Sequence, residues 1–355
     1  MEGQGGTSGQ VRRITWAQRA FILAFVAAGV AVAVADHRAR ARAAADPALA
    51  ARAEDEAEDA ASALAIPPLP RTVAVDGRKV RLGERLYHDV RLSRDDTVSC
   101  ATCHDLERGG TDQLPVSRGV GGVLGPINSP TVFNSGFSFS QFWDGRAKDL
   151  AEQAAGPVHN PKEMGSTWPE VIRKLSADRG YVEAFAAIYP RGIAGDTIAD
   201  AIAEFEKSLV TPDSRFDRFL RGEAQALSAD EKEGYRLFKE YGCVSCHQGV
   251  ALGGNMYQTL GTMEDYFSGR AETAADHGRF NVTGLPWNLH QFKVPSLRNV
   301  ERSFPYLHDG SAKTLEDVLE VMWRNQLGRP LHPDESKRIV AFLKTLSGRY
   351  QGKPL

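Results

Sequence analysis

Apolar positions recur at helical spacing, with polar positions between them, in five separate stretches of the chain. In the stretch 196–210, for example, Ile198, Ile202, Phe205 and Leu209 fall on one face. A period of 3.6 residues is typical of helices that bury one side. The pattern therefore predicts a mostly α-helical fold. The five stretches are 80–87, 196–210, 230–241, 315–325 and 334–346.

The N-terminal part has a different pattern, because 20–35 is an uncharged apolar run that follows several arginines. Its 16 residues would span about 24 Å as a helix, which is short for a membrane span. Ala33-Val34-Ala35 fits a cleavage site, so we expect 1–35 to be a secretory signal peptide, with an uncleaved membrane anchor as the alternative. Residues 36–78, rich in alanine, charge and proline, are expected to form a disordered linker.

Length and charge set broad limits on the rest. A chain of 355 residues is long enough for two ordinary domains. The formal net charge of −2 gives no sign of a nucleic-acid partner.

The candidate chemistry lies in two C-x-x-C-H motifs, Cys100–His104 and Cys243–His247, which use all 4 cysteines of the chain. In such a motif two thiols, Cys100 with Cys103 or Cys243 with Cys246, bond covalently to one haem c, and His104 or His247 follows as the axial iron ligand. A single zinc site is the rival interpretation, but the motifs lie in different halves of the chain, far beyond the spacing of a zinc ribbon, and both carry a histidine. A redox C-x-x-C pair does not explain the histidine either. Two covalent haems are predicted, and haem c is attached outside the cytoplasm.

Two further segments repeat at one offset. Ser129-Pro130-Thr131 parallels Val294-Pro295-Ser296, and Asp144-Gly145 parallels Asp309-Gly310, each pair at an offset of 165. A constant offset indicates an internal duplication. We therefore expect two cytochrome c-type domains in tandem, an N-terminal haem domain at 79–211 and a C-terminal one at 212–355.

The second axial position of each iron decides between electron transfer and catalysis. In the second half the candidate axial ligand is Met322, on the predicted helix 315–325, with Met256 and Met263 as alternatives. The competing interpretation is that Met322 only fills space in the core. The first half offers Gln153 and Glu163 but no strong ligand. An open iron beside a carboxylate suits peroxide cleavage, because the acid can move a proton between the two oxygens.

Specific motifs carry a family resemblance from about Val80 to Gly348. They are Gly125-Pro126-Ile127-Asn128-Ser129-Pro130-Thr131, Gln141-Phe142-Trp143-Asp144-Gly145-Arg146, Glu152-Gln153-Ala154-Ala155-Gly156-Pro157, Phe292-Lys293-Val294-Pro295-Ser296-Leu297-Arg298-Asn299-Val300 and Pro305-Tyr306-Leu307-His308-Asp309-Gly310. In these the chain resembles the bacterial diheme cytochrome c peroxidases.

The resemblance implies a peroxidatic N-terminal haem and a C-terminal haem that receives electrons. It implies that Gln153 and Glu163 are distal pocket residues, that Trp143 conducts electrons between the haems, and that Met322 ligates the second iron. It also implies a bridging calcium ion at Asn128 and the backbone carbonyls of Ser303 and Pro305, since oxygen donors suit that ion.

The chain departs from the family at one position. Many members carry a histidine sixteen residues after the first axial histidine, and it closes the resting peroxidatic iron. Here that position is Val120. The hypothesis is that the first haem is open when oxidised and needs no reductive activation.

The expected function is therefore reduction of hydrogen peroxide to water by a periplasmic enzyme. Electrons would come from a small c-type cytochrome or a cupredoxin, and a homodimer is one of the expected states. MauG-like diheme enzymes, which oxidise a partner protein, are the runner-up, although they carry tyrosine at the position of Met322. A non-catalytic diheme electron carrier is the third alternative.

Overall fold

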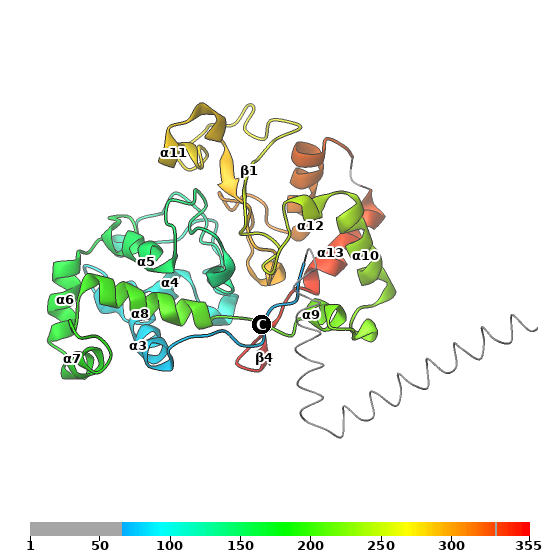
Figure 1. Cartoon of the computed structure of the whole chain (residues 1–355). Coiled ribbons are helices and arrows are strands. Elements are labelled where there is room, and N and C mark those ends of the chain that lie inside the picture. Colours follow the sequence, from blue (N-terminus) through cyan, green and yellow to red (C-terminus); the bar gives the residue numbers. More distant parts are fainter. Residues whose placement is uncertain (1–65, 331) are drawn as a thin grey trace, which may run out of the picture. The chain divides into compact units, whose positions relative to one another are not determined.

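The computed structural model describes residues 66–330 and 332–355, and this part of the chain is mostly helical (Figure 1). The mostly α prediction is confirmed. The expected signal peptide or anchor, 1–35, and the linker residues 36–65 lie outside the described residues. Within the described part, no helix is both long and apolar enough to cross a bilayer.

The first half of the described chain is built on six α-helices. Helix α3 packs along α8, and Gly83 lies at their contact, where a Cβ atom would come within 1.9 Å of the Ala201 carbonyl oxygen. This close approach requires glycine, although an interior glycine weakens a helix by about 0.5–1 kcal/mol. The helices are α3 (Gly77–Tyr87), α4 (Cys100–Cys103), α5 (Leu150–His159), α6 (Trp168–Ser176), α7 (Arg179–Ala186) and α8 (Gly195–Ser208).

The second half repeats this arrangement with other helices. Helix α10 packs along α13, and a Cβ atom on Gly234 would come within 2.0 Å of the Arg338 carbonyl oxygen. Each half thus joins two helices through a glycine contact. The helices are α9 (Arg215–Leu220), α10 (Ala229–Glu240), α11 (Phe280–Thr283), α12 (Leu315–Val321) and α13 (Pro333–Lys344).

Short elements complete the described chain. Strands β1 (Tyr257–Thr259) and β2 (Gln291–Lys293) pair antiparallel, as do β3 (Arg349–Tyr350) and β4 (Lys353–Pro354). The 3-10 turns are η1 (Val90–Leu92), η2 (Leu106–Arg108), η3 (Val120–Gly122), η4 (Ser135–Phe137), η5 (Ala224–Ala226), η6 (Cys243–Ser245), η7 (Pro286–Asn288) and η8 (Val300–Arg302).

The predicted helix 315–325 differs from the observed one. Regular α-helix ends at Val321, and the chain continues as one stretch of π-helix, η9 (Met322–Leu327). Gly328 then ends this stretch with a left-handed backbone (φ 63°). The wider turn begins at Met322, the residue of interest, and such widened turns often occur at functional sites.

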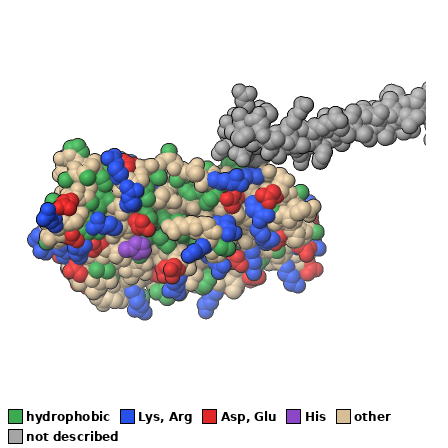
Figure 2. Space-filling model, turned by 90° about the horizontal axis from the view of Figure 1, so that it is seen from below, with side chains coloured by type: hydrophobic (Ala, Val, Ile, Leu, Met, Phe, Trp, Pro, Cys, Tyr) green, Lys and Arg blue, Asp and Glu red, His purple; other side chains and the backbone are tan. Residues whose placement is uncertain are grey.

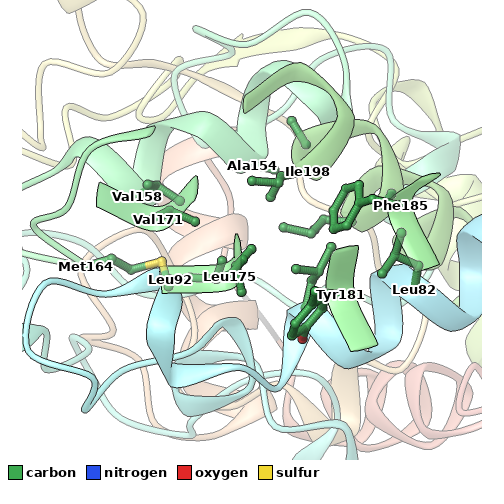
Figure 3. Close-up of a cluster of buried hydrophobic side chains, with 14 of the residues drawn as sticks. Leu82, Leu92, Ala154, Val158, Met164, Val171, Leu175, Tyr181, Phe185 and Ile198 are labelled. Carbon is green, nitrogen blue, oxygen red and sulfur yellow. The ribbon is translucent and has the colours of Figure 1, made fainter. Parts of the chain in front are cut away.

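Two large apolar clusters form the core of the described chain, one in each half. In the first, side chains from α3, α5, α6, α7 and α8 meet, as Figure 3 shows for Leu82, Val171 and Phe185. In the second, α10, α12 and α13 contribute most of the buried residues. Both clusters belong to one compact unit, 63–355, and a boundary at 211 and 212 stays a prediction.

Part of the expected linker is held in place, in contrast to the expectation of a disordered spacer. Leu69 is fully buried. Its backbone N–H donates to the carboxylate of Asp217 (3.0 Å), and its carbonyl accepts from Arg221. The sequence pattern missed this because proline-rich segments have no hydrophobic period, although two apolar residues of this one, Ile66 and Leu69, are buried in the core.

The backbone repeats at the same offset of 165 as the sequence. Asn134 and Asn299 both adopt left-handed conformations (φ 62° and 61°). Both side-chain amides donate to the hydroxyl of Thr211, at 2.8 and 2.9 Å. Equivalent positions of the two halves therefore meet at one residue, as an internal duplication predicts.

The surface shows no concentration of one charge on the face drawn in Figure 2, where acidic and basic side chains are interspersed. This agrees with the net charge of −2.

Candidate active site

The first C-x-x-C-H motif lies on the short helix α4 and its end. Thr102 accepts a hydrogen bond from the backbone of Ser99 (2.9 Å), which starts the helix one residue before Cys100. One helical turn then places Cys100 and Cys103 on the same side. Burial raises the pKa of both thiols, that of Cys103 to about 11.

The His104 ring is oriented by backbone groups. Its Nδ1 atom lies 3.4 Å from the carbonyl oxygen of Gly110. Burial lowers the pKa of His104, while hydrogen bonding to the carbonyls of Gly110 and Pro130 opposes this effect. Neutral imidazole held through one nitrogen is the form that binds a metal with the other.

The second motif has the same environment around His247. Its Nδ1 atom lies 3.2 Å from the carbonyl oxygen of Leu252. Burial lowers the pKa of His247 to about 4, against hydrogen bonds to the carbonyls of Leu252 and Pro295. Pro130 and Pro295 are related by the offset of 165, so the duplicated motif supplies a carbonyl to each histidine. The sequence showed this repeat but not its role, because a backbone carbonyl leaves no trace in residue type.

These residues fit two covalent haems. Each cysteine pair is followed by a half-buried histidine whose Nδ1 atom lies within hydrogen-bond distance of a backbone carbonyl. The rival zinc site requires the four thiols in one place. Among the described residues, no three His, Cys, Asp or Glu side chains gather as a metal site.

The structure brings Glu163 close to the first motif. Its charge acts on the Cys103 thiol, and its Oε1 atom accepts a hydrogen bond from the side chain of Asn160 (2.6 Å). Burial raises the pKa of Glu163, while the charge of Arg146 and the bond from Asn160 act in the other direction. A carboxyl with a raised pKa takes up a proton more readily than a free carboxyl does, which suits a group that transfers protons.

Val120 contacts the same loop. It is 1% exposed, and its backbone N–H donates to the carbonyl oxygen of Glu163 (2.8 Å). Its side chain lies in the apolar cluster with Met164 and Ala154. The residue in place of the family's histidine therefore lies beside Glu163.

Gln153 lies on α5 and is half-buried. Its side chain forms no hydrogen bond within the described chain, so the structure does not link it to Glu163. Pro157, on the same helix, is a residue that the sequence argument missed. It is related to Met322 by the offset of 165, and proline has no side-chain atom that can bind iron. The offset of the duplication could have revealed it.

Trp143 lies where the two halves meet. Its indole N–H donates to the carbonyl oxygen of Asn128 (2.9 Å), and its backbone carbonyl accepts from Lys293 (2.8 Å). Its ring centroid lies 6.5 Å from those of Phe292 and His308. Residues of both halves therefore fix the ring.

Met322 is half-buried at the junction of α12 and η9. It packs against the cluster of Leu260, Phe267 and Phe292, as Trp143 does. A small apolar cluster thus connects Met322 with Trp143. Neither Met256 nor Met263 belongs to this cluster, and Met263 is 62% exposed.

The structure shows the surroundings of the three expected calcium ligands, Asn128, Ser303 and Pro305. Asn128 is 6% exposed, and its amide nitrogen donates to the carbonyls of Leu114 (2.9 Å) and Pro115 (3.3 Å). The amide oxygen is therefore the atom that could bind a cation. Ser303 is half-buried and Pro305 buried. Calcium binding at these three residues stays a prediction.

A family model described as di-haem cytochrome c peroxidase matches residues 77–225. Cytochrome c peroxidase Ccp of Escherichia coli K12 is 50% identical over 286 residues, which are 80% of this chain and 61% of that protein. Cytochrome c551 peroxidase of Nitrosomonas europaea is 48% identical over 284 residues, covering 80% of this chain and 84% of that protein. The chain therefore spans less than two thirds of the first relative and most of the second.

A solved structure is similar as well. The crystal structure of a MauG-like protein associated with microbial copper homeostasis matches with a TM-score of 0.70 and 32% identity. The match covers 79% of this chain and 93% of that chain.

Proposed function

The chain belongs to the di-haem cytochrome c peroxidase family, and from this premise we propose that it reduces hydrogen peroxide to water outside the cytoplasm. The expectation of a peroxidase-type oxidoreductase is confirmed at the level of the family. Electrons would reach the second haem from a small c-type cytochrome or cupredoxin and pass to the first by way of Trp143. The reaction consumes two electrons and two protons for each peroxide and yields two waters.

The observation that carries the proposal is the contrast between two equivalent positions. Met322 offers a thioether to the second iron, whereas Pro157, at the offset of 165, offers no ligand atom. When bound, the first haem supplies an iron with a free position for peroxide, and the second an iron that passes electrons. The asymmetry favours a catalyst over a simple electron carrier.

Glu163 is the residue that moves the proton. Held by Asn160 and half-buried near the first motif, it can accept the proton from one peroxide oxygen and deliver it to the other. Cleavage then produces water instead of hydroxide. Gln153 is proposed to line the same pocket from α5.

Val120 supports activity without prior reduction. Its aliphatic side chain is buried beside Glu163 and cannot bind iron. The diferric protein is therefore expected to show a high-spin or water-bound first haem and to react with peroxide without a lag. A first haem that is entirely low-spin as isolated would contradict this part of the proposal.

The sharpest experiment restores the missing ligand. Val120→His is expected to give a low-spin first haem and to slow the reaction of the diferric protein with peroxide about tenfold or more. Reducing the second haem beforehand should recover much of the rate. Val123→His is the matched control, since Val123 lies in the same loop with 46% of its surface exposed.

Stopped-flow mixing tests the activity itself. The protein is mixed with peroxide and then with a reduced cytochrome, and two cytochromes should be oxidised for each peroxide consumed. Oxidation of a tryptophan on a partner protein without cytochrome turnover would instead favour the MauG-like function. Failure to consume peroxide would leave only an electron carrier.

A further inference from the structure

Two oxidisable side chains, those of Trp323 and Tyr241, lie near Met322 and play no part in the function proposed above. Trp323, the next residue, is 1% exposed, and its ring centroid lies 5.2 Å from that of Tyr241 in an edge-to-face contact. Tyr241 and Cys243, two residues apart, both pack on the apolar cluster that contains Trp323. The pair is therefore close to the attachment point of the second haem.

Tyr241 connects this buried pair with the surface. Its hydroxyl donates to the carboxylate of Glu335 (2.6 Å), and the exposed Arg329 guanidinium lies 4.8 Å from its ring centroid. The bond to Glu335 raises the pKa of Tyr241, so the phenol stays protonated at rest. The same carboxylate can take the phenol proton when an electron leaves the ring.

The first half has no such pair at the equivalent positions. Tyr241 stands two residues before Cys243, and Val98 stands two residues before Cys100. Trp323 corresponds to Val158 by the offset of 165. Both valines are buried in the first apolar cluster. Aliphatic side chains cannot be oxidised in this way, so the equivalent positions of the first half offer no such route.

We propose that Trp323 and Tyr241 form an oxidation relay from the second haem to the surface, where Tyr241 oxidises small phenolic reductants. The proposal rests on the proposed peroxidase function, because peroxide is the oxidant. The relay adds a second path by which oxidising equivalents leave the protein, and this path is used when the donor protein is scarce. Without it, the oxidising equivalents would remain near the Met322 thioether, which is itself prone to oxidation.

The steps balance as follows. Peroxide takes two electrons and two protons and gives two waters, which leaves the protein two electrons short. Trp323 gives one electron towards the second haem. Tyr241 then reduces the oxidised Trp323, and the phenol proton of Tyr241 passes to Glu335. A phenol at the surface then returns one electron and one proton to Tyr241 and becomes a phenoxyl radical. Glu335 then releases its proton to solvent, and two such cycles restore the protein and replace the two protons that peroxide consumed.

The test uses the holoprotein with both haems, peroxide and no protein donor. A nitroso spin trap is added, and the adduct is located by peptide mass spectrometry. Most of the adduct is expected on the peptide that carries Tyr241. Tyr241→Phe should reduce adduct on that peptide at least tenfold, and Trp323→Phe at least fivefold with Tyr241 still present.

Two further variants sharpen the result. Tyr235→Phe is the matched control, because Tyr235 lies on α10, the helix that ends just before Tyr241. Its ring contacts Phe342 and Phe216 instead of Trp323. The adduct pattern of this variant should match the wild type within twofold. Glu335→Gln removes the proton acceptor and should lower the Tyr241 adduct severalfold. The low-spin spectrum of the second haem confirms that each variant is folded around Met322.

A rate measurement gives the functional readout. The ratio of guaiacol oxidation to cytochrome oxidation should fall five- to tenfold in Tyr241→Phe and in Trp323→Phe. An unchanged ratio, or an undiminished Tyr241 adduct in Trp323→Phe, would overturn the relay while peroxide turnover with cytochrome left the proposed function intact. Absence of any cytochrome turnover with peroxide would overturn the proposed function and the relay with it.

Discussion

At the scale of single residues, two carboxyl groups of the first half, on half-buried Glu163 and buried Glu206, have different surroundings. Glu163 is bonded to Asn160 and lies near the charge of Arg146. Glu206 on α8 is 5% exposed, and its Oε2 atom has no hydrogen-bond partner in the described chain. The first can exchange protons, whereas the second is held neutral by burial.

Glu163→Gln tests the proton transfer. The amide keeps the shape and the contact with Asn160 but cannot take up and return a proton, so we expect peroxide reduction to slow by about 10²–10⁴-fold. Stopped-flow spectroscopy measures the rate of reaction with peroxide. Glu152→Gln, an exposed position on α5, should stay within about twofold of the wild type, and an equal loss there would contradict the assignment.

Glu206 predicts a pH dependence of stability. Burial raises its pKa from 4.5 to about 8. The folded protein therefore keeps the proton between these values while the unfolded chain releases it, so the contribution of Glu206 to stability is fully present below about pH 4.5 and is lost as pH rises through 8. The loss is on the order of 4 kcal/mol. Glu206→Gln should remove this slope, as measured by urea unfolding at pH 5 and pH 8.

The matched control for that experiment is Glu183→Gln on α7, an exposed residue whose side chain is 63% accessible. Its unfolding free energy should follow the wild type at both pH values. If Glu206→Gln and the wild type lose stability equally between pH 5 and pH 8, the carboxyl is ionised in the folded protein.

At the scale of elements, the sequence pattern predicted the helices well and their contacts poorly. The stretches 80–87, 196–210, 230–241 and 334–346 all lie within or largely within helices α3, α8, α10 and α13. Apolar periodicity reports that one face is buried. It does not report what lies opposite, which is why the pairing of α3 with α8 came only from the structure.

Gly83 illustrates a contact that no periodicity reveals. Gly83→Ala would place a methyl group 1.9 Å from the Ala201 carbonyl oxygen, so we expect a loss of about 1–3 kcal/mol as α3 moves from α8. Gly77→Ala is the control in the same helix, because its nearest contact is the flexible Arg81 side chain at 3.6 Å. Chemical denaturation should show Gly77→Ala at or slightly above the stability of the wild type, because alanine favours the helix; a comparable loss in both variants would mean that the contact with Ala201 is not the cause.

At the scale of the whole described chain, sequence motifs predicted both the candidate haem sites and the contrast between Met322 in the second half and the lack of a strong ligand in the first. Cysteine and histidine spacing was sufficient to predict two haem sites, since covalent attachment tolerates no other order. Pro157 and the carbonyls of Pro130 and Pro295 were missed, because their roles lie in an absent ligand atom and in the backbone. The offset of 165 relates Pro130 to Pro295 and Pro157 to Met322, so applying it to each candidate residue would have found them.

The connection between the N-terminal segment and the second half depends on one buried ion pair. Arg298 and Asp217 are both fully buried, with 2.6 Å between Nη1 and Oδ1. Arg298 also donates to the carbonyl of Pro67 (3.2 Å), and Asp217 accepts from Leu69. The pair therefore holds the segment around Leu69 against the second half. Eight residues after Leu69 the chain enters α3, which belongs to the first half.

Asp217→Asn leaves the guanidinium buried without its counter-charge, so we expect a loss of about 3–5 kcal/mol in the free energy of unfolding. Because the neutral amide oxygen is a weaker acceptor for the Leu69 N–H than the carboxylate is, residues near 66–76 should become sensitive to protease before the whole chain unfolds. Asp213→Asn is the control, since Asp213 pairs with Arg71 and Arg221 at the surface and should cost only about 0–1 kcal/mol. Equal losses in the two variants, or cleavage that starts elsewhere in Asp217→Asn, would show that the segment is held by Ile66 and Leu69 alone.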